Sequence, residues 1–265
     1  GFVMNANNTP FLAAGPGSEI DPSAYSPYLG IELGMTNRGL RATELLAADT
    51  SITPDELLAI KMDMTYSKQS WVGSWMASFA ALDLKDAPEL AKAQKLLAGW
   101  DWTSDGKGSA DAFAERIIRF GARPHWLGDT MPDARSTLQE AVTEFTSRFG
   151  RIDPPLRNIQ RLRRGNVDLP MLGGTDALRA TTAWDADQAD GKMRVKHGDS
   201  FIMLVRWDKA GNVLSESIQP YGAATTRPES PHYTDQMKLF VAGKYKPVHF
   251  EWADAVKHAK RRYRP

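Results

Sequence analysis

The sequence predicts an α+β fold, with helices grouped in the middle of the chain and strands towards its ends. Three observations lead to this prediction. Of the 265 residues, 42% are apolar and 25% are charged, as in globular proteins that bury a core. Helix-start signals and helical spacing of apolar residues are concentrated in residues 35–155. After Pro154-Pro155 the pattern changes to apolar or alternating runs separated by turn residues.

We therefore expect three segments. Residues 1–34 should hold a short strand at residues 2–4 and a loop rich in Gly, Pro and Ser. Residues 35–155 should be helical, and residues 156–265 should form a strand-rich closing segment with helices at its C-terminal end.

Local signals place the elements of the helical segment. Residues 37–48 contain good helix formers, with apolar positions at Leu40, Leu45 and Leu46. Thr53, followed by Pro54 and then Glu56, has the pattern of a capping box at a helix start. A further helix should follow Pro132 and end at Gly150. Aromatic side chains should pack these helices together: Trp71, Trp75, Phe79, Trp100 and Phe113.

The closing segment should contain a β-hairpin. Residues 200–207 form an apolar run with β-branched members, which predicts a strand covered on both faces. Residues 208–212 supply turn chemistry, and residues 213–219 alternate. Ser230-Pro231 should begin a helix that continues through Val241, and residues 252–262 should form a short basic helix.

Composition and motif searches exclude several classes of site. The net charge is +1 and there is no cysteine, so nucleic acid is not an expected partner and thiolate metal sites are excluded. No apolar run is long enough to cross a bilayer, and no signal peptide is visible. The five histidines form no recognised metal pattern, so we expect no metal site in this chain. The abrupt opening on an apolar triplet suggests a fragment.

The stretch Asn5-Ala6-Asn7-Asn8-Thr9-Pro10 has two interpretations. It is typical of a turn, because Asn tolerates left-handed conformations and hydrogen-bonds its own backbone. The same stretch could also hold a side-chain amide at the end of a strand, aimed at a developing oxyanion. A neutral amide N–H suits that role because it stabilises negative charge without titrating.

This stretch resembles the Asn-x-Asn-Asn/Asp-x-Pro motif of the penicillin acylase family. Residues 37–46 resemble the arginine-bearing helix of that family. Residues 161–170 with Gly173-Gly174 resemble a stretch of its acyl-homoserine-lactone and aculeacin acylase branch, and residues 198–201 and 230–236 resemble its closing signatures. The matches follow the order of the family and cover nearly the whole chain.

The resemblance implies a hydrolase acting on the carbon–nitrogen bonds of linear amides, part of an N-terminal-nucleophile αββα sandwich with a large helical segment in the middle. Such enzymes mature from a zymogen by self-cleavage, and a serine with its own α-amino group then attacks the amide. Asn7 matches the oxyanion-hole asparagine. Arg38 matches the arginine that organises the site, although it could also be an ordinary arginine on a helix surface.

The resemblance also implies that essential parts lie outside this chain. Only six residues precede Asn7 and Gly1 has no hydroxyl, so the serine should lie upstream. The expected partners are the upstream nucleophile-bearing part of the β-chain, the α-chain of the same precursor and a small acylated amide substrate. No cofactor is expected in this chain, whereas calcium could bind the full-length enzyme. The expected location is the periplasm or the exterior.

Other interpretations remain open at this stage. A non-catalytic small-molecule binding or scaffold module that keeps the acylase fold would carry the same motifs. An unrelated helical interaction protein is disfavoured, because the apolar run at residues 200–207 needs a sheet to join. The possible substrates are β-lactams, acyl-homoserine lactones, lipopeptides and plain amides. A β-lactam substrate would link the protein to antibiotic metabolism.

Overall fold

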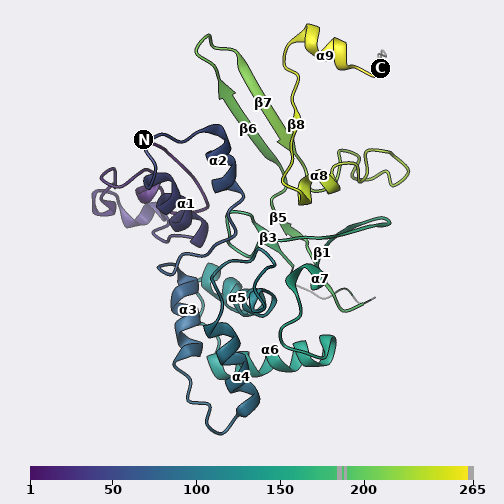
Figure 1. Cartoon of the computed structure of the whole chain (residues 1–265). Coiled ribbons are helices and arrows are strands. Elements are labelled where there is room, and N and C mark those ends of the chain that lie inside the picture. Colours follow the sequence, from purple (N-terminus) through teal and green to yellow (C-terminus); the bar gives the residue numbers. More distant parts are fainter. Residues whose placement is uncertain (184–186, 188–189, 262–265) are drawn as a thin grey trace. The chain divides into compact units, whose positions relative to one another are not determined.

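The computed structural model describes residues 1–183, 187 and 190–261, and it confirms a mixed α+β fold (Figure 1). The chain forms two compact units. The first unit comprises residues 1–161 and 170–198, and the second comprises residues 162–169 and the chain from Asp199 onwards. Among the described residues, no helix is both long enough and apolar enough to cross a bilayer.

The N-terminal part of the first unit is irregular. The predicted strand at residues 2–4 is wrong: only Val3 forms an isolated antiparallel bridge, with Ala14. A strand of three residues with a single partner gains too few ladder hydrogen bonds to extend. Three short 3₁₀ turns follow, each with proline at its first position: η1 (Pro10–Leu12), η2 (Pro22–Ala24) and η3 (Pro27–Leu29).

Helices dominate the rest of this unit, as predicted. The Thr53 capping box is present, because its Oγ1 accepts from Glu56 N and the Glu56 carboxylate accepts from Thr53 N. The helix after Pro132 also forms and ends at Gly150 with a left-handed φ of 68°. The helices are α1 (Asn37–Ala47), α2 (Pro54–Lys61), α3 (Trp71–Ala80), α4 (Pro88–Ala98), α5 (Asp111–Leu127), α6 (Ala134–Phe149) and α7 (Leu156–Ile159).

The core of this unit lies where α3, α4, α5 and α6 pack against one another. Phe79, Phe113 and Phe145 are fully buried there, and the last two meet edge to face with ring centroids 5.3 Å apart. Each buried phenylalanine stabilises the fold by about 1.5–3 kcal/mol through removal of apolar surface from water. The predicted aromatic packing of the helices is therefore confirmed for Phe79 and Phe113.

Short strands follow the helices along the chain, and residues 162–169 among them belong to the second unit. Strand β1 (Gln160–Arg164) lies between β2 (Val167–Pro170) and β4 (Met193–Arg194), and β1 and β4 are parallel. Strands β3 (Thr181–Thr182) and β5 (His197–Gly198) pair antiparallel. The segment at residues 173–180 lies between β2 and β3 in the chain. It approaches the N-terminus of α1 and carries one of the groups of the candidate site.

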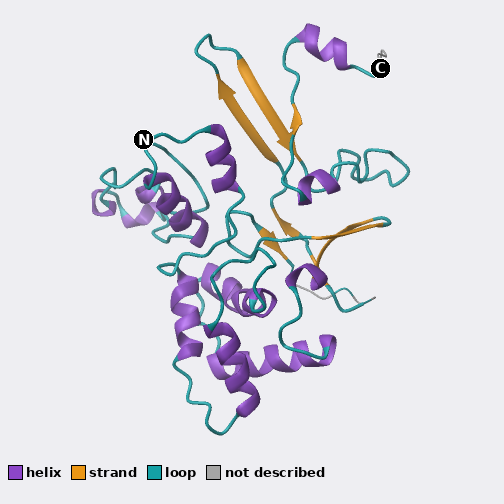
Figure 2. Cartoon of the chain, viewed as in Figure 1, coloured by secondary structure: helices purple, strands orange, loops and turns teal. Residues whose placement is uncertain are grey.

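The second unit contains the predicted hairpin, drawn as paired orange arrows in Figure 2. Strands β6 (Ile202–Trp207) and β7 (Val213–Ile218) pair antiparallel, and β8 (Lys246–Pro247) joins β7. The prediction that residues 200–207 are covered on both faces is wrong, since Trp207 is 67% exposed. The run is apolar, but Met203 and Val205 are 39% and 40% exposed, so the described residues leave their face of the strand largely uncovered.

The C-terminal helices of the second unit are shorter than predicted. Helix α8 (Met237–Val241) begins seven residues after Ser230. The preceding segment instead makes backbone hydrogen bonds to residues 221–224, including Gln236 N to Tyr221 O at 2.8 Å. Helix α9 (Trp252–His258) forms where a basic helix was expected; the predicted end at residue 262 lies outside the described residues.

Candidate active site

The asparagine-rich stretch forms a tight turn that exposes the side chain of Asn7. Asn7 has a φ of 58°, a left-handed conformation that Asn adopts more readily than most residues. Its backbone N–H donates to Asn5 Oδ1 at 2.9 Å. Asn8 is buried and braces the turn, because its Oδ1 accepts from Ala6 N and its Nδ2 donates to Thr9 O. The stretch is thus a turn whose conformation presents the Asn7 amide.

The same turn is attached to the start of α1. Thr36, the N-cap of α1, donates from Oγ1 to Ala6 O at 2.9 Å and accepts from Gly39 N at 3.0 Å. Gly39 lies so close to the turn that a Cβ there would be 3.1 Å from Asn8 Cβ. A glycine at this helix position therefore lets the turn pack against α1, which brings the side chain of Arg38 next to Asn7.

Arg38 joins the turn to a buried carboxylate. Its Nη2 donates to Asn7 Oδ1 at 3.1 Å, and its Nε donates to Asp176 Oδ1 at 3.0 Å. A guanidinium has donors only, so the atom of the Asn7 amide that faces it must be the oxygen. The Nδ2 group then lies on the other side of the amide. Within the described part of the chain, Asn7 Nδ2 donates to no other group.

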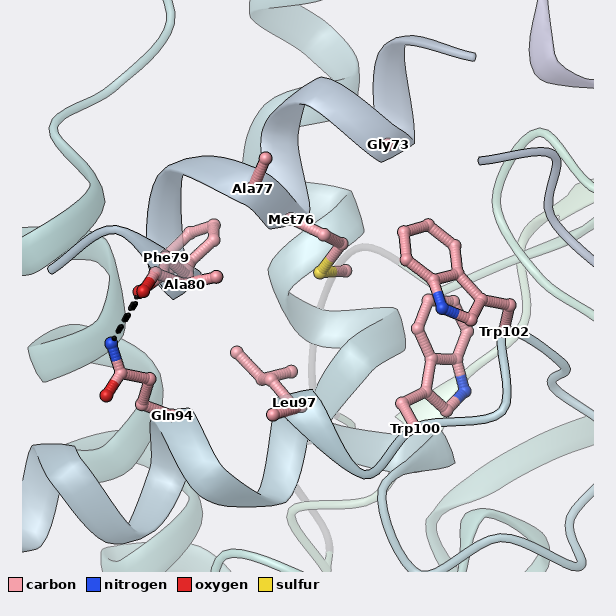
Figure 3. Close-up of a pocket in the computed structure, with 10 residues that line it drawn as sticks. Gly73, Met76, Ala77, Phe79, Ala80, Gln94, Leu97, Trp100 and Trp102 are labelled. Atoms are coloured by element: carbon pink, nitrogen blue, oxygen red, sulfur yellow. Dashed lines mark hydrogen bonds between the residues drawn. The ribbon is translucent and has the colours of Figure 1, made fainter. Parts of the chain in front are cut away.

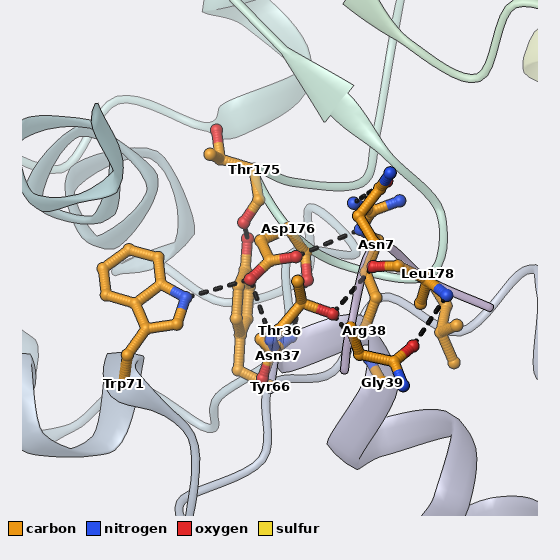
Figure 4. A network of polar contacts seen from close by, with 12 residues as sticks. Asn7, Thr36, Asn37, Arg38, Gly39, Tyr66, Trp71, Thr175, Asp176 and Leu178 are labelled. Atoms are coloured by element: carbon orange, nitrogen blue, oxygen red, sulfur yellow. Dashed lines mark hydrogen bonds and ion pairs between the residues drawn. The ribbon is translucent and has the colours of Figure 1, made fainter. Parts of the chain in front are cut away.

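Asp176 is the centre of this network (Figure 4). Its side chain is fully buried, and its φ is 64°. Besides Arg38, its carboxylate accepts from Asn37 N at 2.8 Å and from Trp71 Nε1 at 2.9 Å, and its backbone oxygen accepts from Asn37 Nδ2. Four donors from three residues, on helices α1 and α3, therefore fix this residue, and its negative charge is balanced by the guanidinium of Arg38.

A second buried carboxylate supports the segment that carries Asp176. Glu115 of α5 accepts from Ser104 Oγ at 2.6 Å, from Tyr66 Oη at 2.7 Å and from Thr175 N at 3.1 Å. Burial raises the pKa of the Glu115 carboxyl above its ordinary value. A Cβ on Gly174 would lie 1.9 Å from Glu115 Oε1, so only glycine permits this approach. Residues 174–176 are thus held against α5.

An open pocket lies beside Asn7 and Arg38. It has a volume of about 410 Å³, within the usual size range of ligand sites, and its other lining residues come from residues 32–36 and the end of α5. There the His125 ring stacks on Trp71, with centroids 4.7 Å apart. Burial lowers the pKa of His125, which favours a neutral imidazole at this wall of the pocket. The pocket therefore offers a charged side at Arg38 and Glu32 and an aromatic side at Trp126.

The comparison with known families assigns the chain to one family. The profile of the penicillin amidase family matches residues 1–257. The chain belongs to the penicillin amidase family. Membership indicates a hydrolase that acts on amides. No curated protein matches the chain.

Both site residues that the sequence resemblance indicated line this pocket, in contact with each other. Asp176 was not predicted, although it contacts Arg38 directly. It lies 138 residues further along the chain, and the only local signal is the glycine pair Gly173-Gly174 just before it. The roles of Asn7 and Arg38 in the reaction remain predictions.

A second cavity, between α3 and α4, has no comparable chemistry (Figure 3). Its volume is about 200 Å³, and its wall is formed largely by apolar and aromatic side chains such as Met76, Leu97 and Trp102. Gln94 contributes the only side-chain amide of this wall, and its Nε2 is used in a hydrogen bond to Phe79 O at 2.9 Å. None of the lining residues has a titratable side chain, so this cavity offers no acid, base or nucleophile.

Proposed function

We propose that this chain supplies an oxyanion-hole donor, Asn7, and its positioning residue, Arg38, to an amide hydrolase of the N-terminal-nucleophile type. The observation that carries the proposal is the orientation of the Asn7 amide. Its oxygen is held by the donor-only guanidinium of Arg38, so its N–H₂ group is available to an acceptor. The adjoining pocket has room for part of a substrate.

The chemistry follows from that orientation. A serine hydroxyl outside this chain attacks the amide carbonyl while the α-amino group of the serine takes up the proton. The carbonyl oxygen becomes an oxyanion, and Asn7 Nδ2 donates a hydrogen bond to it. The amide is held in place before the reaction, so little reorganisation is needed as the charge develops. Arg38 prevents the Asn7 side-chain amide from flipping, and its guanidinium adds positive charge near the oxyanion.

We further propose the context of the family for this chain. It would form the C-terminal region of the β-chain in an αββα sandwich, with the upstream nucleophile-bearing part and the α-chain as partners. The motifs favour the acyl-homoserine-lactone and aculeacin acylase branch, a zymogen precursor and a periplasmic or secreted location. Calcium would bind outside this chain. By itself the chain would be inactive, because one oxyanion donor without a nucleophile provides no covalent route.

The test is amidase activity of the full-length protein on acyl-anilides of several chain lengths, with Asn7→Ala as the variant. Loss of one oxyanion donor lowers kcat roughly 10²–10³-fold, so we expect that loss in a protein that stays folded, with a small drop in melting temperature because Ala adopts the φ of 58° less readily than Asn. Asn212→Ala is the matched control, since Asn212 is an exposed asparagine in the β6–β7 turn and should leave kcat unchanged. An unimpaired Asn7→Ala enzyme, or a parent inactive on every substrate, would favour the binding-module alternative instead.

A further inference from the structure

The second unit brings three potential metal ligands together after its last strand. His249 follows β8, and Asp254 and His258 lie one turn apart on α9, on the same face of the helix. His249 Nδ1 is 2.5 Å from Asp254 Oδ2, and His258 Nδ1 is 3.0 Å from Asp254 Oδ1. The three donor atoms all lie within 4.8 Å of one another.

The two imidazole rings are arranged face to face. Their centroids are 4.1 Å apart and their planes differ by 11°, so one edge of each ring faces the same carboxylate. A single divalent cation would satisfy both ring nitrogens and the carboxylate at once.

We propose that His249, Asp254 and His258 form a binding site for a divalent transition-metal ion of the Zn²⁺ type, with water completing the coordination. Two imidazoles and one carboxylate are a ligand set that suits zinc, whereas calcium requires six to eight oxygens. Sequence analysis predicted no metal site here, because the spacing of these residues matches no recognised motif.

The distances and exposure are compatible with such an ion. Zinc bonds of about 2.0–2.1 Å in a tetrahedral site place the ligand atoms about 3.3 Å apart. The observed separations of 2.5 Å to at most 4.8 Å span that value, so rotations of the side chains are sufficient. The side chains are 29–47% exposed, which leaves the site open to ions from solvent. Lys257, a cation on the same helix, should weaken binding, so we expect an exchangeable ion.

Binding at this position would connect the segment after β8 to α9. Helix α9 has only seven residues, and a helix of that length is marginal without tertiary contacts. A bound ion would therefore protect residues 249–258 from amide hydrogen exchange. This effect is independent of the amidase pocket, which lies in the first unit.

The test is titration of the full-length protein, first passed over a chelating resin, with Zn²⁺ and with Co²⁺, whose visible spectrum reports its coordination. His258→Ala and Asp254→Asn are the variants. His232→Ala is the matched control, because His232 Nδ1 contacts Asp235 Oδ2 at 2.8 Å with no third metal-ligating side chain among the described residues.

We expect one equivalent of Zn²⁺ to bind with exchange protection of residues 249–258. Each ligand variant should weaken that binding at least about tenfold, since even the groups that orient metal ligands contribute 10–100-fold. The His232→Ala protein should bind as the parent does. Equal binding by the ligand variants, an equal loss in His232→Ala, or no saturable binding by the parent would each overturn the proposal.

Discussion

Replacement of Asp176 by Asn tests the buried centre of the site. The two side chains have the same shape, and Asn also tolerates the φ of 64°, so the change adds neither bulk nor backbone strain. It removes the charge that balances Arg38 and replaces one acceptor oxygen with an NH₂ donor. Whichever way the amide turns, this donor faces either Arg38 Nε or the pair Asn37 N and Trp71 Nε1.

The expected cost follows from burial. Breaking a fully buried ion pair costs about 3–5 kcal/mol, because the remaining charge has no partner. The Asp176 side chain is fully buried, but Arg38 is 29% exposed and water can solvate part of it. The ion-pair contribution should therefore lie at or below the lower end of that range, and the donor–donor conflict adds to it. We expect a loss of about 3 kcal/mol in the free energy of unfolding.

Urea unfolding of the parent and of Asp176→Asn measures this loss, and anilide hydrolysis measures its effect on kcat. The control is Asp83→Asn, which removes a carboxylate from an exposed ion pair with Lys85 and should cost less than about 1 kcal/mol. We expect kcat to fall as well, because Arg38 loses its anchor. A loss of stability no larger than that of the control, with kcat unchanged, would refute the role of Asp176.

Two further predictions concern stability. Burial raises the pKa of the Asp111 carboxyl to about 7, so its contribution to stability is fully present below about pH 4 and is lost as the pH rises through 7. Asp111→Asn cannot titrate, so its melting temperature relative to the parent should rise between pH 5 and pH 8; a constant difference would contradict this. Thr53→Ala removes the capping box of α2 and should cost about 1 kcal/mol in urea unfolding, and no measurable change would mean that this cap contributes nothing.

Sequence signals predicted elements whose determinants are local. The capping box at Thr53, the helix ended by Gly150 and the β6–β7 hairpin each depend on neighbouring residues, and all three form as expected. Helix α5 lies within the predicted helical segment, but its bounds were not predicted, because Glu115 and Arg119 occupy buried positions and interrupt its apolar spacing. Those polar side chains are buried by tertiary contacts that no local pattern reveals.

Other errors also trace to tertiary structure. The apolar run at residues 200–207 predicted a strand. The sequence of a strand does not determine whether a second layer covers it, because that layer comes from other parts of the chain. Ser230-Pro231 has the residues of a helix start, yet backbone hydrogen bonds to residues 221–224 hold that segment in turns. Asn7 and Arg38 were found by resemblance, whereas Asp176 reaches Arg38 only through the folded chain.

The central claim is that Arg38 acts on the reaction by holding the Asn7 amide, and a double-mutant cycle on kcat tests it most directly. The variants are Arg38→Lys, Asn7→Ala and the pair. A lysine ammonium lacks the planar fork that contacts Asn7 and Asp176 together, so Arg38→Lys should lower kcat about tenfold in the parent. In the Asn7→Ala background the same change should have little effect. Full multiplication of the two losses would contradict the account, because Arg38 would then act independently of Asn7.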